Sequence, residues 1–198
     1  MSNTDFMTEV DRFIDEKWEE IVEEIARLVS IPSVADFDRA TPEDPSGPEA
    51  HDGLRAAVDL AQRLGFDARD DAGQIGIADL KGESDTMLGM ICHSDVVAPG
   101  VGWTLDPWTL LRKDGFLLGR GVLDDKGPLV VALYCRSFSK TRARNFRTRC
   151  ACLLAPTRKR VLCAMSRTIW RTIPLLHSRL RRMICSLFAT GKKAALTA

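Results

Sequence analysis

The fold of this chain depends on residues 87–128, MLGMICHSDVVAPGVGWTLDPWTLLRKDGFLLGRGVLDDKGP. The first part of this stretch, Met87–Cys92, has the length and apolar composition of a buried strand. His93-Ser94-Asp95 follows directly, so the strand ends on an imidazole and a carboxylate. Because open α/β folds bind ligands at the carboxyl ends of their strands, we expect His93 and Asp95 to lie at the functional edge of a sheet.

A second polar group follows about thirty residues later in the same stretch. The glycine-rich turn Gly119-Arg120-Gly121 leads to the adjacent carboxylates Asp124 and Asp125, and Lys126-Gly127 comes next. Imidazole nitrogen and carboxylate oxygen are ligands that Zn²⁺ accepts, and a catalytic zinc site keeps one position open for water. A lone H-x-D pattern usually marks only a hydrogen-bonded histidine, whereas its pairing with G-R-G-x-x-D-D-K-G is much more specific and indicates a metal site.

Together these motifs resemble those of the two-zinc amidohydrolase and metallopeptidase superfamily that includes acetylornithine deacetylase, succinyl-diaminopimelate desuccinylase and carboxypeptidase G. The segments G-W-T-x-D-P-W (102–108) and G-V-L-D-D-K-G-P (121–128) are most similar to its dipeptidase branch, the Xaa-His dipeptidases and carnosinases. The resemblance covers roughly residues 5–138. It implies an α/β domain with a mixed sheet and zinc-dependent hydrolysis of a dipeptide or of another N-acyl amide bond.

The resemblance also implies a role for each matching residue. His93 corresponds to a ligand of one metal, and Asp95 to the catalytic-site carboxylate that orients this imidazole. Asp124 corresponds to the carboxylate that bridges both metals. Asp125 follows it, typically through a cis peptide bond in the family.

Other parts of the family pattern are absent from this chain. The pattern requires a Glu-Glu pair some thirty residues further on, of which the first is the general base and the second a metal ligand. A further carboxylate and a histidine near the C-terminus complete it, whereas no acidic residue follows Asp125 here. Of the two zinc ions of the family, we therefore expect one weakly bound ion or none.

The charges of the chain are distributed very unevenly. Residues 1–135 carry all 27 acidic residues and 12 of the 28 lysines and arginines, so the other 16 basic residues lie in residues 136–198. Five of the six cysteines also follow residue 134, at spacings typical of neither a zinc ribbon nor a disulfide framework. We predict that residues 1–138 are the N-terminal part of a catalytic domain and that residues 139–198 are an aberrant basic tail without a consistent core.

A changed reading frame is the explanation of this tail that we favour. Synonymous codons can be chosen for residues 142–194 that, read one frame over, spell G-A-K-L-P-Y-T-L-R-V, then G-T-N-E-E-T-G and later Y-G-E-K-G. These are the features expected of the family's next strand and of its missing Glu-Glu pair, which would fall over Thr157–Arg160. We therefore favour a frameshift near Ser139 and an inactive product.

Two alternatives remain open for the tail. It could be a basic arm that binds nucleic acid by neutralising phosphates, although regular aromatic residues are lacking. It could also contain a basic helix over residues 171–188 that lies on a membrane, although Pro174 and a broken apolar stripe oppose this. The N-terminus has no secretory signal and no apolar run reaches the roughly 20 residues of a membrane span, so we expect a cytoplasmic protein whose partner is a small peptide or N-acyl amino acid.

Local patterns predict the remaining elements. Apolar residues at helical spacing predict helices over residues 5–30, 51–64 and 127–138, and a loop over 34–48. Strands are predicted at residues 66–68 and 75–80, and a hairpin pairs 109–112 with 116–118 across Lys113-Asp114-Gly115. His51, at a predicted helix start beside Asp52, is expected to be solvated.

Overall fold

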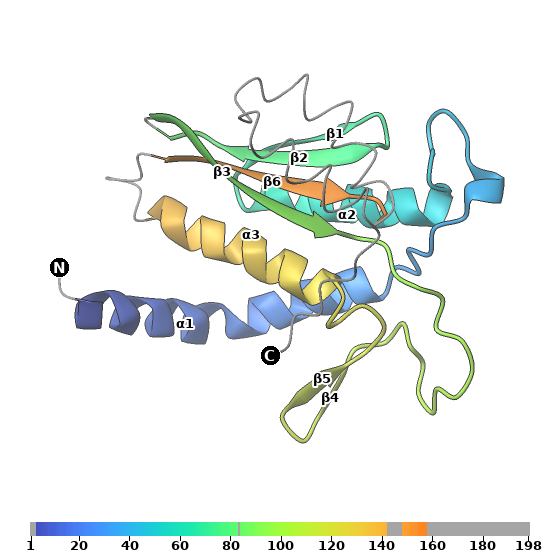
Figure 1. Cartoon of the computed structure of the whole chain (residues 1–198). Coiled ribbons are helices and arrows are strands. Elements are labelled where there is room, and N and C mark those ends of the chain that lie inside the picture. The colour runs from blue at the N-terminus through green and yellow to red at the C-terminus, as the bar shows by residue number, and fades with distance from the viewer. Residues whose placement is uncertain (1–2, 83, 142–147, 158–198) are drawn as a thin grey trace, which may run out of the picture. The chain divides into compact units, whose positions relative to one another are not determined.

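The computed structural model describes residues 3–82, 84–141 and 148–157. Four of its strands form one mixed sheet in the order β1–β2–β6–β3 (Figure 1). These strands are β1 (Asp67–Asp71), β2 (Ile75–Leu80), β3 (Ser84–His93) and β6 (Thr148–Ala155). β1 pairs with β2 and β2 with β6 in antiparallel fashion, whereas β6 and β3 run parallel. The predicted α/β class with a mixed sheet is confirmed.

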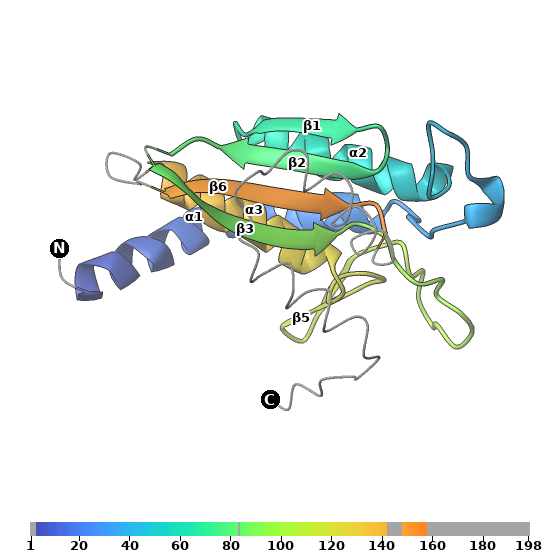
Figure 2. The ribbon, with the colours of Figure 1, turned by 45° about the horizontal axis from the view of Figure 1, so that its top comes forward.

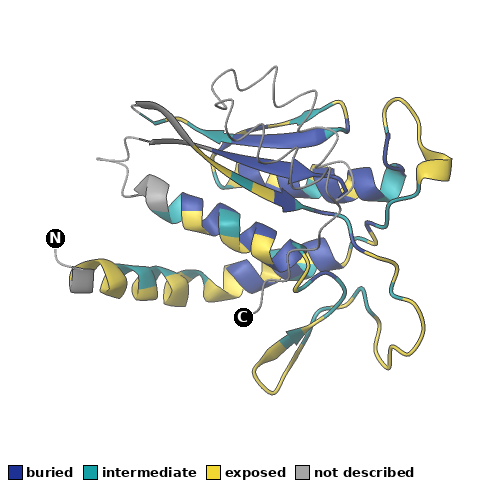
Figure 3. Cartoon of the chain, in the orientation of Figure 1, coloured by how far each residue is buried: buried dark blue, intermediate teal, exposed yellow. Residues whose placement is uncertain are grey.

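Three helices lie on the same side of this sheet (Figures 1 and 2). α2 (Pro48–Arg63) packs against β1 and β2, α3 (Lys126–Thr141) packs against β3 and β6, and α1 (Asn3–Val29) packs against the other two helices. The buried faces of α2, of α3 and of the second half of α1 point inward, as the dark blue in Figure 3 shows, whereas Phe6, Met7, Ile14 and Trp18 in the first half of α1 are exposed. The buried core includes Ile25, Leu28, Leu54, Leu60, Ala78, Leu129, Leu133, Cys152 and Leu154.

Local signals in the sequence account for where these elements begin and end. α1 ends at Val29, before Pro32, and α2 starts three residues earlier than predicted because Pro48 suits the first helical turn. The predicted loop contains a short 3₁₀ helix, Phe37–Arg39. The predicted hairpin forms from β4 (Leu111–Lys113) and β5 (Phe116–Leu118). Its two turn residues, Asp114 and Gly115, have φ of 52° and 81°, as a type I′ turn requires.

The structure corrects the prediction that Met87–Cys92 is a buried strand. Among the described strands, β3 lies at the edge of the sheet, and its Leu88 and Ile91 are 52% and 44% exposed, although Cys92 is buried. The inner position belongs instead to β6, and all of residues 151–157 are buried. The apolar run Cys150–Ala155 is a buried-strand signal, but the many basic residues around it led to its prediction as part of the tail.

Within the predicted tail, β6 pairs with β2 and β3, and α3 continues to Thr141, while the domain boundary at residue 138 stays a prediction. Residues 142–147 and 158–198 of the predicted tail lie outside the described part of the chain. Within the described part, no helix is long and apolar enough to cross a membrane.

Candidate metal centre

The end of β3 brings His93 into contact with two carboxylates. The Nε2 atom of His93 lies 3.0 Å from Asp124 Oδ1, and its Nδ1 atom lies 2.9 Å from Asp95 Oδ1. Nδ1 also lies 3.2 Å from the backbone oxygen of Asp95. The structure thus brings together the three residues that the sequence singled out, while their roles toward a metal stay predictions.

Asp125 fixes the backbone on which His93 stands. The backbone N–H of His93 donates a hydrogen bond to Asp125 Oδ2 over 3.1 Å. The peptide bond between Asp124 and Asp125 is cis, which confirms the geometry implied by the resemblance. The sequence had given Asp125 no contact of its own, since a hydrogen bond across 32 positions has no local signal.

The carboxylates of Asp95, Asp124 and Asp125 around His93 favour a cation at this site. Burial of the ring works against the charged imidazolium, but Asp95, Asp125 and Asp124 outweigh it and hold the pKa of His93 above its ordinary value. The carboxylate side chain of Asp124 is 65% exposed, whereas the ring of His93 is 14% exposed. A cation can therefore approach from the side of Asp124.

The neighbouring thiol is protonated at neutral pH when no ion is bound. Burial, together with the nearby charge of Asp125, raises the pKa of Cys92 to about 11. A thiol binds a metal as thiolate, and this thiol stays protonated in the absence of an ion.

The described residues fit half of a zinc site. Two ligands bound to one tetrahedral zinc ion at about 2.0–2.1 Å lie roughly 3.3 Å apart, close to the 3.0 Å between His93 Nε2 and Asp124 Oδ1. A catalytic zinc site, however, uses three protein ligands and a water. Within residues 3–82, 84–141 and 148–157, no group of three or more His, Cys, Asp or Glu side chains is arranged to hold a metal. The donor set is therefore incomplete.

His51 forms a second histidine–carboxylate cluster, in a different part of the domain. Its ring is buried, so the predicted solvated position is wrong. Nδ1 contacts Asp44 Oδ1, from the loop before α2, and Nε2 contacts Asp70 Oδ2 on β1. Because the two carboxylates lie on opposite nitrogens of the ring, they cannot share one ion with it. The cluster joins the loop to the sheet.

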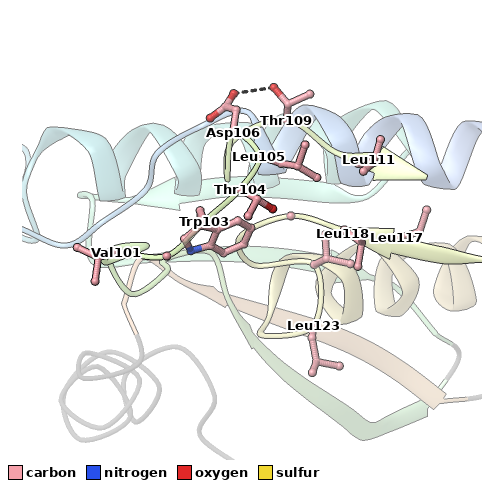
Figure 4. Close-up of a pocket in the computed structure, with 13 residues that line it drawn as sticks. Val101, Trp103, Thr104, Leu105, Asp106, Thr109, Leu111, Leu117, Leu118 and Leu123 are labelled. Carbon is pink, nitrogen blue, oxygen red and sulfur yellow. Dashed lines mark hydrogen bonds between the residues drawn. The ribbon is translucent and has the colours of Figure 1, made fainter. Parts of the chain in front are cut away.

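A pocket of about 470 Å³ lies next to the glycine-rich turn Gly119-Arg120-Gly121 (Figure 4). Its walls come from residues 101–111 and 117–123 and are mainly apolar, with Trp103, Leu105, Leu118 and Leu123 among them. The guanidinium of Arg120 lies 5.2 Å from the ring centre of Trp103, which holds the loop against the glycine-rich turn. Leu123 immediately precedes Asp124, so the pocket adjoins the candidate centre along the chain.

No family model matches the chain. Among curated proteins, it is 40% identical over 118 residues to SH1171 of Staphylococcus haemolyticus (strain JCSC1435), whose name assigns it provisionally to the dipeptidases. That match covers 58% of this chain and 24% of the relative. It is 38% identical over 119 residues to the Beta-Ala-Xaa dipeptidase of Lactobacillus delbrueckii subsp. lactis, covering 60% of this chain and 25% of the relative. The chain thus spans about a quarter of the length of the curated relatives it matches.

Among solved structures, human carnosine dipeptidase 1 has a similar fold. The TM-score is 0.63 at 23% sequence identity, over 81% of this chain and 38% of that one. At this level of identity the likeness concerns the fold alone. Together with the sequence relatives, it confirms the predicted resemblance.

Proposed function

Because this chain is related to the dipeptidase branch of the two-zinc metallopeptidase superfamily, we propose that its described part is a portion of a metal-dependent peptidase domain. The reaction class is hydrolysis of the peptide bond of a dipeptide, or of a similar N-acyl amide bond. The observation that supports this most directly is the contact between His93 and Asp124 at the end of β3. The sequence motifs pair the same two residues.

In this proposal His93 and Asp124 hold one ion, for which zinc suits the nitrogen and oxygen donors. Asp95 contacts the other ring nitrogen, so it fixes the tautomer and the orientation of the imidazole. When bound, the ion would supply Lewis-acid chemistry. Since the described donors do not complete a zinc site, no hydrolytic step is assigned to this chain.

We further propose that the 198-residue chain does not hydrolyse dipeptides by itself. No acidic residue stands at Thr157–Arg160, where the Glu-Glu pair of the family is expected, so its general base and one metal ligand have no counterpart there. The absence of acid throughout residues 126–198 and the codon reading both support a frameshift. β6 falls within the stretch assigned to the altered frame.

The test compares two proteins that differ only after the proposed frameshift. The 198-residue chain and a frame-restored version are purified, supplied with Zn²⁺ and assayed with dipeptides. We expect activity only in the frame-restored protein, because a general base contributes about 10² to 10⁴ in rate. Hydrolysis by the 198-residue chain that His93→Ala abolishes would contradict the proposal, and sequencing the gene across codon 139 tests the frameshift itself.

The basic residues of positions 136–198 support one alternative function, the binding of nucleic acid. Sixteen lysines and arginines without an acid would bind nucleic acid through its phosphates, with affinity that falls steeply with salt. We expect only weak retention on a DNA column, lost at moderate salt. Tight, salt-dependent retention that disappears on removal of residues 158–198 would favour the nucleic-acid-binding alternative.

A further inference from the structure

Lys126 is the largest of the completely buried side chains in the described part of the chain, with 1% of its surface exposed. Its Nζ atom donates hydrogen bonds to the backbone oxygens of Leu28 and Ile31, each over 2.7 Å. Lysines are rarely buried without a partner, and here carbonyl oxygens take that place.

The two acceptors explain why a cation is tolerated at this position. Leu28 lies in the last turn of α1, where the helix dipole is negative. Its oxygen also accepts the N–H of Ile31 over 3.2 Å, and the oxygen of Ile31 accepts the N–H of Ser33 over 2.8 Å, so Lys126 takes the second acceptor position of each carbonyl. Ile31 lies two residues beyond that end. An apolar side chain of similar length would fill the space but could not hold these oxygens. The ammonium therefore joins the start of α3 to the end of α1.

The segment after α1 also supports the other half of the candidate centre. Ser33 Oγ donates to the backbone oxygen of Ser94 over 2.6 Å, and the N–H of Val96 donates to the backbone oxygen of Ser33 over 3.0 Å. Val34 and Val96 form a parallel bridge. Ser94 and Val96, which follow His93, are thus hydrogen-bonded to the segment after α1 that also binds Lys126.

We propose that Lys126 is a positioning residue that sets Asp124 relative to His93. It reaches neither partner itself and acts through the backbone, since Asp124 and Asp125 immediately precede it. Its stem is closely packed: a Cβ atom at Gly121 would lie 3.0 Å from Lys126 Cδ. The inference rests on the proposed function only in treating His93 and Asp124 as metal ligands.

The test removes the ammonium group by substitution and records the NMR signals of the His93 ring in the metal-free 198-residue chain. Lys126→Met keeps the stem, and Lys113→Met removes an exposed cation from the hairpin as the matched control. Ring ¹H–¹⁵N spectra are recorded at fixed pH, with the signals of the three histidines assigned by single substitutions. We expect the hydrogen-bonded ring signal of His93 to change in Lys126→Met alone. The His51 signal, fixed by Asp44 and Asp70, must stay and reports an intact fold.

Each outcome decides the proposal. An unchanged His93 signal in folded Lys126→Met would overturn it. If that variant does not fold, Lys126→Gln, which keeps a donor for one of the two oxygens, replaces it. Loss of both histidine signals there as well would show a general folding role and would also overturn the proposal.

A zinc titration of the same samples separates this inference from the proposed function. We expect affinity at least about tenfold weaker in Lys126→Met than in Lys113→Met, as for other groups that orient ligands. Absence of any His93-dependent zinc binding in the unsubstituted chain would count against the proposed function alone. The ring signal of His93 would still decide the role of Lys126.

Discussion

Two histidines of this domain each meet a carboxylate at both ring nitrogens, but they differ in how far their surroundings are closed. The ring of His51 is 6% exposed and its partners Asp44 and Asp70 are 24% and 25% exposed. The ring of His93 is 14% exposed, yet its partner Asp124 is 65% exposed. The carboxylate of Asp124 in the second cluster is therefore accessible from solvent.

The difference shows that a histidine between carboxylates is not by itself a metal site. Both histidines have their two carboxylates on opposite ring nitrogens, but at His51 both carboxylates are largely buried and join a loop to a strand. At His93, Asp95 contacts Nδ1 and orients the ring. Asp124 Oδ1 lies 3.0 Å from Nε2, a spacing at which both atoms could bind the same ion. The closed cluster serves stability, and the open one is the candidate centre.

The largest expected effect separates the two histidines by activity. In the frame-restored enzyme, His93→Ala should lower kcat/KM for a dipeptide by at least about 10²-fold. A lost ligand should exceed the 10- to 100-fold typical of groups that orient ligands. His51→Ala should stay within about threefold at a temperature where the variant is folded. Equal losses in the two variants would break the comparison.

The second effect reverses the order of the two histidines and concerns stability. His51→Ala leaves two largely buried carboxylates without their shared partner, which should lower the free energy of unfolding by about 2–3 kcal/mol. His93→Ala should cost about 1 kcal/mol, since the exposed Asp124 returns to water. Urea denaturation followed by circular dichroism measures both. A larger loss for His93→Ala would mean that the open cluster is structural.

A smaller effect sharpens the role of the carboxylate behind His93. Asp95→Asn should weaken zinc binding of the frame-restored enzyme about tenfold, because the amide no longer fixes the imidazole as the carboxylate does. Asp106→Asn is the matched control, because the carboxylate of Asp106 accepts its hydrogen bonds from the backbone N–H of Trp108 and the hydroxyl of Thr109, within its own loop. Competition with a chromophoric chelator gives both affinities, and equal affinities would remove Asp95 from the site.

Much of the fold could be predicted because its signals are local. The helical spacing in α1 and α2, the strand at Ile75–Leu80 and the Asp114-Gly115 turn each depend on neighbouring residues alone. The meeting of His93 and Asp124 followed from motif spacing, since the carboxyl end of a strand and the start of a helix converge at such edges.

The features that the sequence missed all depend on distant partners. β6 takes the inner place in the sheet by pairing with β3, more than sixty positions earlier, and nothing in its own residues indicates that partner. His51 is buried because Asp44 and Asp70 come from separate elements. Lys126 is buried because Leu28 and Ile31 offer it oxygens across almost a hundred positions.

The central claim is that the open cluster binds a metal ion and the closed cluster does not. Calorimetric titration of the 198-residue chain with Zn²⁺ tests it most directly, alongside His93→Ala and His51→Ala. We predict weak binding of one ion that His93→Ala abolishes and that folded His51→Ala retains. Binding that survives His93→Ala, or that disappears only with His51→Ala, would contradict the assignment of the centre.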